Sequence, residues 1–527
     1  MLGKLFQKVS QSPTHPRPTP APRRFDVAEL YEGPASLAEA PDPRALPLDE
    51  KLRRAYFWIV NSAILSPHYD IEFHDGPAPE FLLGDRKARL VLPSDQSYSS
   101  YVLLPLLTFA TQRKCLFIGG PGRGKTASAI LMGVLAGYPV REVRRGMQRG
   151  HPQLTVADLV GSPLPKDLIG ADQVDQVRIA WRQWLSMRVK IVDEYNRIPT
   201  RTQSALLTLM GDNYVELYDQ VYECPPAAWY LTANDDAGGG TYQVIEALRD
   251  RIDVIVQALP FNPRYLSELL TRIEENARPE EFVPPEILFT AAEIERMGAE
   301  IRRLPVPRPV LRRLEHFASQ FEFSDVAGEQ FEYKAKDTAR LAGTDWAQLS
   351  AQDDGRDRLK DLGCQTVNGL SVRNLLTLLS YAKAMAWFRG APEVTLADVT
   401  QVLPFVLCDK LKPDLDAPYF AAAERFALKS DRIGWLRQLF TASCQEYDRL
   451  GLDREDPVAV LLEQIRPGLE GVAEAEVRKR LAQIERTIGE LGRGGKLYGT
   501  LHDDLMVLKS LHQRYRNYLS WLLSRPA

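Results

Sequence analysis

The sequence predicts an α/β protein, in which a parallel sheet is followed by a helical segment and a C-terminal helical hairpin. Between residues 114 and 260, short apolar strands alternate with helical patterns, as is typical of a doubly wound parallel sheet. After Pro263, apolar residues recur at helical spacing almost to the end of the chain. With 527 residues, the chain should also form about three folded units rather than a single core.

The composition is that of a globular protein and excludes several other classes. Hydrophobic residues make up 45% of the chain and charged residues 26%, and the net charge is −3. This balance argues against a surface built to coat nucleic acid. The five cysteines lie far apart, the N-terminus lacks an apolar signal segment, and the longest apolar run is residues 101–110. We therefore expect a cytoplasmic protein with reduced thiols and no membrane span.

The first hundred residues divide into a tail and an extension. Residues 1–48 are rich in proline, with five prolines between Pro13 and Pro22, and should lack regular structure. A plain leader is the favoured interpretation, and a docking tail is the alternative. Residues 49–100 are interpreted as an N-terminal extension with a helix over 52–65, short strands over 71–73 and 89–92, and a helix that starts near residue 97.

The α/β core is expected over residues 101–262 and the helical segment over 263–412. The strands are predicted at residues 115–119, 140–143, 189–192, 229–232 and 252–256. The helices of the following segment are predicted at residues 265–273, 291–304, 309–321, 375–388 and 396–407, with a polar insertion near 324–369. Residues 413–527 should be helical, because apolar residues from Val477 to Leu491 step by four and three and resume after a Gly-rich turn at 492–495. This pattern predicts an antiparallel hairpin.

The strongest motif is a glycine-rich loop between a strand and a helix. It consists of Gly119, Gly120, Pro121, Gly122, Arg123, Gly124, Lys125 and Thr126, and it fits the pattern GxxxxGK[ST]. Glycines allow the backbone N–H groups and the helix N-terminus to point at phosphate oxygens. Lys125 would contact the β- and γ-phosphates, and Thr126 would offer its hydroxyl to Mg²⁺. The sequence therefore predicts a site for ATP and Mg²⁺, and residues 119–126 are called the phosphate-binding loop below.

Two carboxylates follow the predicted strand at residues 189–192. Asp193 would hold the Mg²⁺ ion through its hydration shell, and Glu194 would orient and deprotonate the attacking water. An apolar run followed by Asp-Glu is common, but here it follows the phosphate-binding loop in the same α/β unit. Asn234 ends the next strand and could orient the water against the γ-phosphate.

These residues resemble the AAA+ ATPases, and within them the MoxR family. The resemblance is concentrated in Asp193–Pro199 and Thr202–Leu207. Further matches lie at residues 158–161, 240–242, 246–247, 250–251 and 371–373, so that roughly residues 100–412 are covered.

The resemblance implies further roles and partners. Asn234 resembles sensor 1, Arg373 resembles sensor 2, and Arg251 resembles the arginine finger that enters a neighbouring subunit's site, with Arg249 as a rival for that role. It also implies a ring, expected to be a hexamer, that remodels or matures a protein complex in a chaperone-like way. A partner with a von Willebrand A domain is a further expectation of this kind.

The basic cluster at residues 141–151 has several interpretations. Arg141, Arg144, Arg145, Arg149 and His151 could face a central pore or nucleic acid, or form a solvated or ion-pairing surface. The last is favoured, because no aromatic platform for stacking bases accompanies the cluster.

Other functions remain open beside protein remodelling. The alternatives are an AAA+ motor stimulated by nucleic acid and a nucleotide-gated scaffold without turnover. A small-molecule kinase fits least, since the segment after the core resembles an AAA+ lid.

Overall fold

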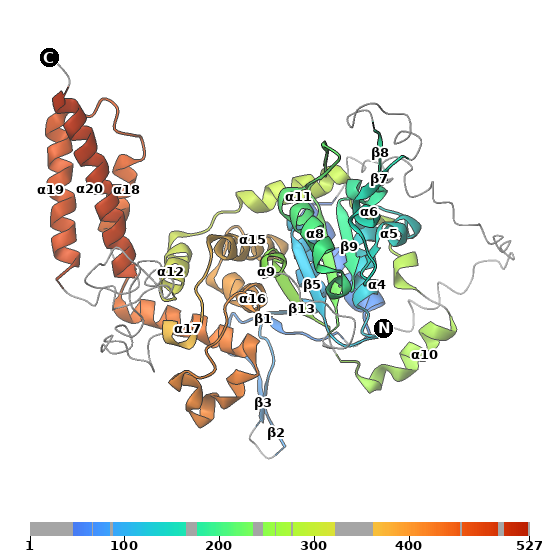
Figure 1. The fold of residues 1–527 in the computed structure, drawn as a ribbon. Coiled ribbons are helices and arrows are strands. Elements are labelled where there is room, and N and C mark those ends of the chain that lie inside the picture. The colour runs from blue at the N-terminus through green and yellow to red at the C-terminus, as the bar shows by residue number, and fades with distance from the viewer. Residues whose placement is uncertain are drawn as a thin grey trace.

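The structure is a computed structural model, and it describes most of the chain outside its N-terminal tail (Figure 1). The described residues are 46–65, 67–84, 88–164, 177–234, 246–258, 260–275, 278–321, 362–453, 456–493 and 500–524. The predicted tail up to residue 45 and the greater part of the predicted insertion therefore lie outside the described residues.

A five-stranded sheet with the order β13-β5-β12-β9-β6 forms the centre of the α/β core. All four strand pairs are parallel, as the alternation of strands and helices predicts. The strands are β5 (Lys114–Ile118), β6 (Gln148–Arg149), β9 (Val189–Asp193), β12 (Ala228–Ala233) and β13 (Val254–Gln257). Because the strands are parallel, the residues that follow β5, β9 and β12 meet at one edge of the sheet.

One predicted strand is wrong. Residues 140–143 belong to the helix α5 (Val140–Gly146), and the edge strand is the shorter β6. Val143 and Met147 are buried while the arginines between them are not, so the apolar spacing here is that of a helix. Pro139 also precedes the first turn, a position from which proline readily starts a helix.

Helices cover the sheet, and two β-hairpins extend from it. The helix α3 (Ser100–Thr111) contains the longest apolar run of the chain, and it is buried along nearly its whole length. It packs against the sheet on one side and against helices of the lid on the other, which explains the absence of a polar face. The other elements are α4 (Lys125–Leu135), α6 (Val156–Val160), β7 (Gly161–Pro163), β8 (Ile179–Trp181), α8 (Thr200–Asp212), β10 (Tyr214–Leu217), β11 (Gln220–Glu223) and α9 (Glu246–Asp250).

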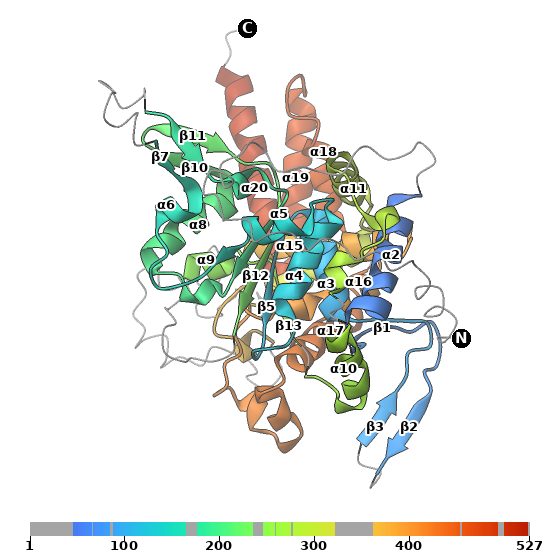
Figure 2. The same cartoon turned by 90° about the vertical axis from the view of Figure 1, so that its right-hand side faces the viewer.

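The N-terminal extension packs onto the core and lid instead of forming a separate unit. Its elements are α2 (Leu48–Trp58), a π-helical turn (Ile59–Ala63), β1 (Ile71–Phe73), β2 (Glu80–Leu83), β3 (Ala88–Val91) and β4 (Gln96–Tyr98). A buried ion pair between Lys51 and Glu293, 2.9 Å long, joins α2 to the lid helix α11. The β2–β3 hairpin projects from the body with its side chains exposed (Figure 2).

The helical lid and its continuation share a core with the sheet. The helices are α10 (Leu266–Glu274), α11 (Ala291–Arg303), α12 (Arg308–Ser319), α15 (Val372–Phe388), α16 (Leu396–Leu407) and α17 (Arg432–Leu450). The large hydrophobic core extends from Leu48 to Cys444 and so includes α17. The end of the predicted insertion, residues 362–369, is ordered: Gln365 is buried and its carbonyl accepts a hydrogen bond from Asp414 N at 2.8 Å.

The C-terminal helices have a core of their own. They are α18 (Pro457–Ile465), α19 (Glu474–Leu491) and α20 (Thr500–Ser524), and their apolar residues form a second cluster among the described residues. Arg480 donates to the Tyr515 hydroxyl at 3.1 Å and Glu485 lies 2.9 Å from His512, so α19 and α20 run antiparallel. The predicted α/β class, helical lid and C-terminal hairpin are thereby confirmed.

The sequence also predicts reduced cysteines and helices that do not span a membrane. All five cysteines are free thiols, and Cys115, Cys224 and Cys444 are buried. In the described part of the chain, every helix is too short or too polar to span a bilayer.

A buried histidine should make the lid sensitive to acid. His316 of α12 is 3% exposed and packs edge-on against Tyr447 of α17. Burial lowers the pKa of His316 to about 4. The unfolded chain therefore takes up this proton near pH 6.5 and the folded chain only near pH 4, so stability is lost as the pH falls between these values.

We expect acidification from pH 7 to pH 5 to cost about 2 kcal/mol through this one group. Urea unfolding followed by circular dichroism at both pH values measures the effect, and His316→Gln should remove it. His512, which lies on the partly exposed side of α20, provides the control variant His512→Gln. An unchanged pH dependence in His316→Gln would contradict the assignment.

Candidate nucleotide site

The phosphate-binding loop joins β5 to α4 and has the backbone shape that its glycines predict. Gly122 and Gly124 have φ angles of 72° and 75°, values that residues with a side chain rarely adopt. A side chain at Gly119 would place its Cβ 2.8 Å from the Cβ of Ala258. Gly124 is the N-cap of α4, so the loop leads directly into the positive end of a helix dipole. This geometry suits an anion such as a phosphate.

Lys125 is buried, and its ammonium group lies inside the loop. Its Nζ donates to the carbonyl oxygens of Gly119 and Gly120 at 2.6 and 2.8 Å. It also donates to Oδ1 of Asn234 at 3.0 Å, which brings the end of β12 to the loop. These contacts place the positive charge of Lys125 at the carboxyl edge of the sheet, inside the loop.

The carboxylate of Asp193 lies beside the hydroxyl of Thr126. Thr126 Oγ1 donates to Asp193 Oδ1 at 2.9 Å, and Thr232 Oγ1 donates to the same oxygen at 2.6 Å. Thr232 also accepts the backbone N–H of Glu194 at 2.9 Å, so this one hydroxyl positions both acidic residues. A carboxylate next to a hydroxyl is a hard oxygen donor set, and it fits Mg²⁺ that is shared with substrate phosphates.

Glu194 is held apart from Asp193 by an unusual backbone conformation. Its φ is 51°, in the left-handed region, which turns its side chain away from the direction of the strand. Its carboxylate lies 3.4 Å from Nδ2 of Asn234 and 3.4 Å from Nε of Arg197. With 37% of the side chain exposed, the carboxylate can contact a water molecule beside a bound phosphate.

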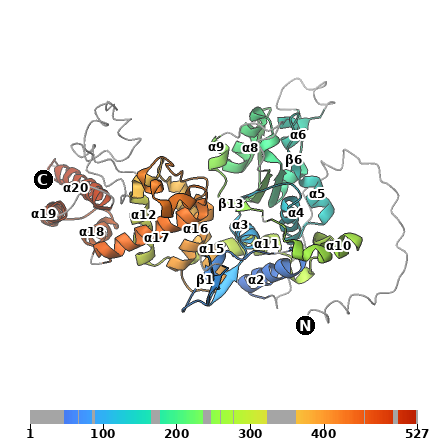
Figure 3. The same ribbon diagram turned by 90° about the horizontal axis from the view of Figure 1, so that it is seen from below.

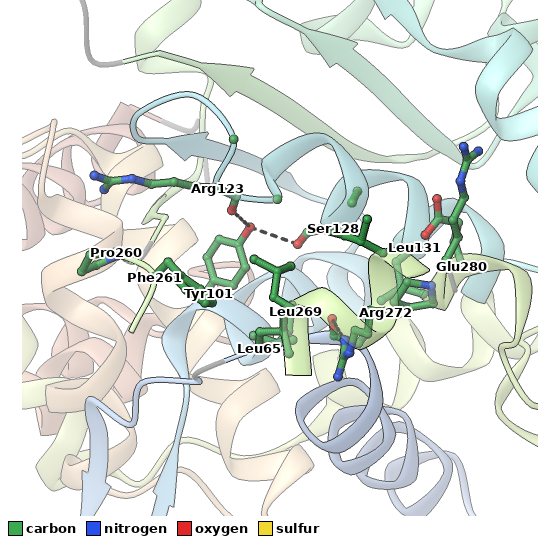
Figure 4. Close-up of a pocket in the computed structure, with 18 residues that line it drawn as sticks. Leu65, Tyr101, Arg123, Ser128, Leu131, Pro260, Phe261, Leu269, Arg272 and Glu280 are labelled. Atoms are coloured by element: carbon green, nitrogen blue, oxygen red, sulfur yellow. Dashed lines mark hydrogen bonds between the residues drawn. The ribbon is translucent and has the colours of Figure 1, made fainter. Parts of the chain in front are cut away.

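A cavity of about 700 Å³ opens next to the phosphate-binding loop (Figure 4). Its apolar wall combines the N-terminal extension, α3, α4, the segment after β13 and α10, through residues Ile64, Leu65, Tyr101, Leu131, Phe261, Leu269 and Ile273. Volume and lining are those of a small-molecule site. Because the loop residues Gly122, Arg123 and Gly124 form part of the wall, phosphates in the loop would place an attached base and sugar in this cavity.

Tyr101 connects the cavity to the loop. Its hydroxyl donates to the carbonyl of Arg123 at 3.3 Å and accepts from Ser128 Oγ at 3.0 Å (Figure 4). Burial raises the pKa of Tyr101 to about 12, so the hydroxyl keeps its proton at neutral pH. The loop is therefore braced by a neutral hydrogen bond from α3.

Arg251 and Arg373 lie at the opposite edge of the sheet. Arg373 forms a 2.5 Å ion pair with Asp250, and Arg251 donates to the carbonyl of Leu207 in the middle of α8. Both arginines lie near Lys114, the first residue of β5. Burial lowers the pKa of Lys114 most, and the positive charges of Arg373 and Arg251 lower it further. The five residues of β5 separate this edge from the phosphate-binding loop by about 15 Å.

Arg249, the rival of Arg251, is engaged elsewhere. Its guanidinium pairs with Asp409, which follows the lid helix α16. Arg249 thus ties α9 to the lid, whereas Arg251 packs against Gly211 of α8.

The sequence predicted the residues around the phosphates correctly, but it did not predict the cavity or the position of the two arginines. The structure brings together Lys125, Thr126, Asp193, Glu194 and Asn234 at one edge of the sheet. It does not bring Arg251 and Arg373 to them within one chain. Thr232 and the apolar wall of the cavity were missed, because threonine in a strand and apolar residues near helix ends carry no signal of their own. Residues 235–245, which contain the predicted family match at 240–242, lie outside the described residues.

The family comparisons agree with an ATPase core followed by a lid. Residues 114–254 match the ATPase family associated with various cellular activities (AAA), and residues 364–425 match an AAA lid domain. Chaperone MoxR1 of Mycobacterium tuberculosis (strain ATCC 25618 / H37Rv) is 25% identical over 311 residues, 56% of this chain and 73% of that protein. A crystal structure of a candidate ATPase from Cytophaga hutchinsonii ATCC 33406 aligns with a TM-score of 0.42 and 19% identity, over 64% of this chain and 89% of that chain.

Proposed function

This chain is an AAA+ protein of the MoxR family, and from that premise we propose that it hydrolyses ATP with Mg²⁺ as a ring that remodels a protein complex. The observation that carries the proposal is the meeting of Lys125, Asn234 and Glu194 beside the Thr126–Asp193 pair. These five side chains supply a cation for the phosphates, oxygen ligands for a metal ion, and a base with a partner that orients it.

Each residue has a distinct task in this proposal. The phosphate-binding loop holds the β- and γ-phosphates through backbone N–H groups and Lys125. Thr126 and Asp193 would hold Mg²⁺, whose charge stabilises the transferred phosphoryl group. Glu194 accepts a proton from the attacking water, and Asn234 keeps the Glu194 carboxylate and the water in place. The apolar cavity beside the loop would hold the nucleobase and the sugar of ATP.

The proposal is tested by phosphate release from the purified full-length chain. We expect turnover with ATP and Mg²⁺ that stops when a chelator removes the metal and returns when Mg²⁺ is added. ATP binding without any phosphate release would leave a nucleotide-gated scaffold as the function, and turnover that depends on added DNA would favour a nucleic-acid motor.

The position of Arg251 and Arg373 supports a ring. About 15 Å of sheet separates them from the γ-phosphate position of their own subunit, which is farther than an arginine side chain reaches. An arginine on this edge can instead complete the site of a neighbour in a head-to-tail ring. Both residues would then act on the transition state only after assembly.

Mixed rings distinguish this arrangement from a structural role. Arg251→Ala and Lys125→Ala chains should each be inactive, but a one-to-one mixture should restore activity at about one site in four, where an intact loop meets an intact finger. A mixture of Arg251→Ala with Arg373→Ala provides the control, because every site then borders a defective edge and no recovery is expected. Absence of recovery in the first mixture would reject catalysis between subunits.

Remodelling of a client is the least direct part of the proposal. It is supported by the relationship to a protein named as a chaperone. A chain that binds ATP but hydrolyses it slowly should retain its client, so pull-down with Glu194→Gln in ATP is the direct test. A von Willebrand A domain protein is the partner class that the family relationship suggests.

A further inference from the structure

The short helix α9 is held in place by residues of the lid. Figure 3 shows α9 beside α8, at the side of the core nearer to the lid helices α15 and α16. The helix has five residues, too few to be stable through its own hydrogen bonds. Arg251 follows α9 directly, so the contacts that fix the end of this helix also fix the residue that resembles the arginine finger.

Lys410 supplies hydrogen bonds at the C-terminal end of α9. Its Nζ donates to the carbonyl oxygens of Arg249 and Asp250 at 2.7 and 2.8 Å. The last carbonyls of a helix have no partner within the helix, and a lysine side chain can satisfy them. Because the Asp250 carbonyl belongs to the peptide bond that leads to Arg251, Lys410 fixes the direction in which the chain enters Arg251.

The position of Lys410 is itself fixed by the lid. Its backbone N–H donates to the Leu407 carbonyl at 2.9 Å, and its carbonyl accepts from Nδ2 of Asn368 at 2.7 Å. The side chain is 8% exposed. Burial lowers the pKa of Lys410, and the charges of Asp250 and Asp409 oppose this effect. Moving a buried ammonium group away from its acceptors costs free energy, so this contact differs from a loose surface ion pair.

Two ion pairs join the same helix to the lid. Arg249 donates through Nε to Asp409 at 3.0 Å, and Asp409 precedes Lys410 in the turn after α16. Arg373, in the first turn of α15, pairs with Asp250 at 2.5 Å. Asp409 and Lys410 are called the finger clamp below. The clamp therefore holds both a side chain and the main chain of α9.

Apolar packing anchors α9 but does not orient its end. Leu248 and Ile252 are buried in the large core. Hydrophobic contacts are not directional, whereas hydrogen bonds to carbonyl oxygens are. The orientation of the peptide before Arg251 thus depends on the finger clamp, and a movement of the lid would change it.

We propose that the finger clamp positions Arg251 for catalysis in the neighbouring subunit, with Lys410 as the main positioning residue. The inference rests on the proposed function, because it requires that Arg251 acts within a ring. Since Asp409 and Lys410 belong to the lid, a shift of the lid in one subunit displaces its Arg251 and so lowers hydrolysis in the next subunit. The lid of each subunit thereby regulates the site of its neighbour.

The test is ATP turnover by Lys410→Met, in which the side chain keeps its approximate length but loses its charge and its donors. We expect kcat to fall about tenfold or more, because the finger is displaced, while ATP affinity stays within about threefold. Lys410→Arg can still donate to carbonyl oxygens and should retain more turnover than Lys410→Met. Lys429→Met, at an exposed position after the lid, removes the same charge and should behave like the original chain.

Mixed rings show whether the defect lies in the site of the neighbour. A Lys410→Met chain keeps an intact phosphate-binding loop, which an unmodified finger from a Lys125→Ala chain should complete. In a one-to-one mixture, half of the intact loops meet such a finger, so turnover per intact loop should rise about fivefold over Lys410→Met alone. A mixture of Lys410→Met with Arg251→Ala should show no rise. A lid that is merely destabilised would impair the loop of its own chain, and mixing would not restore it.

Several results would overturn the proposal. They are unchanged turnover in Lys410→Met, an equal loss in Lys429→Met, and a defect that Lys125→Ala chains do not relieve. Recovery of Arg251→Ala but not of Lys410→Met by Lys125→Ala chains refutes the finger clamp alone. Absence of recovery in both mixtures refutes catalysis between subunits, and the finger clamp with it.

Discussion

Replacement of Glu194 by glutamine should lower ATP turnover by about two to four orders of magnitude, the usual contribution of a positioned general base. The amide keeps the size of the side chain and its hydrogen bond to Asn234, but it cannot accept a proton from water. Because the phosphates are held by Lys125 and the loop, ATP affinity should stay within about threefold of the original value. Phosphate release under saturating ATP measures the first quantity, and titration with a fluorescent ATP analogue measures the second.

The matched control for this variant is Glu216→Gln. Glu216 is exposed on β10 and belongs to the same α/β unit, so the substitution changes the same functional group outside the site. Turnover in the Glu216 variant should be unchanged. Normal turnover in Glu194→Gln would show that another group activates the water.

Replacement of Lys125 by alanine should weaken ATP binding by about a hundredfold, or roughly 3 kcal/mol, because a charge-assisted contact to the phosphates is lost. The ammonium is already oriented by Gly119, Gly120 and Asn234, so the original chain spends little conformational entropy in binding. Isothermal titration of the variant with ATP and Mg²⁺ measures the loss.

Two controls test whether the loss of affinity comes from removing any lysine or from unfolding of the loop. Lys383→Ala removes a partly buried lysine of the lid, whose Nζ donates to the Arg302 carbonyl, and it should leave ATP affinity unchanged. Thermal unfolding of Lys125→Ala without nucleotide checks that the loop still folds, since the substitution leaves two carbonyls without their donor. A folded variant with unaltered ATP affinity would contradict the phosphate-binding role of the loop.

The parts of the site that the sequence predicted are those in which chemistry requires one residue type at one spacing. The loop at residues 119–126 needs glycines, a lysine and a hydroxyl in a fixed order, and the strand before Asp193 is apolar apart from Lys190 because it is buried on both faces. The structure places these segments together because parallel strands end at the same edge. Residue type and order were therefore sufficient to predict which side chains meet in the site, namely Lys125, Thr126, Asp193, Glu194 and Asn234.

The parts that the sequence did not predict depend on contacts between distant segments. The cavity beside the loop brings Leu65 of the N-terminal extension near Leu269 of the lid, about two hundred residues apart, and neither residue differs locally from any other buried leucine. The wrong strand at 140–143 has a similar cause, because two valines three residues apart are compatible with both a short strand and a helix. The position of Arg373 on the far edge of the sheet depends on how the lid folds back, which sequence patterns could not reveal. Arg251, in contrast, lies on that edge because it precedes the parallel strand β13.

The separate core of α18, α19 and α20 has a consequence for how the chain can change. These helices meet the lid through polar contacts such as the 2.7 Å ion pair between Arg308 and Asp456, and their apolar residues do not merge with the large core. Insertions, deletions or wholesale exchange of this three-helix unit would thus leave the packing around the nucleotide untouched. We therefore expect that this three-helix unit can change in evolution, or be exchanged by protein engineering, without a change in the nucleotide site.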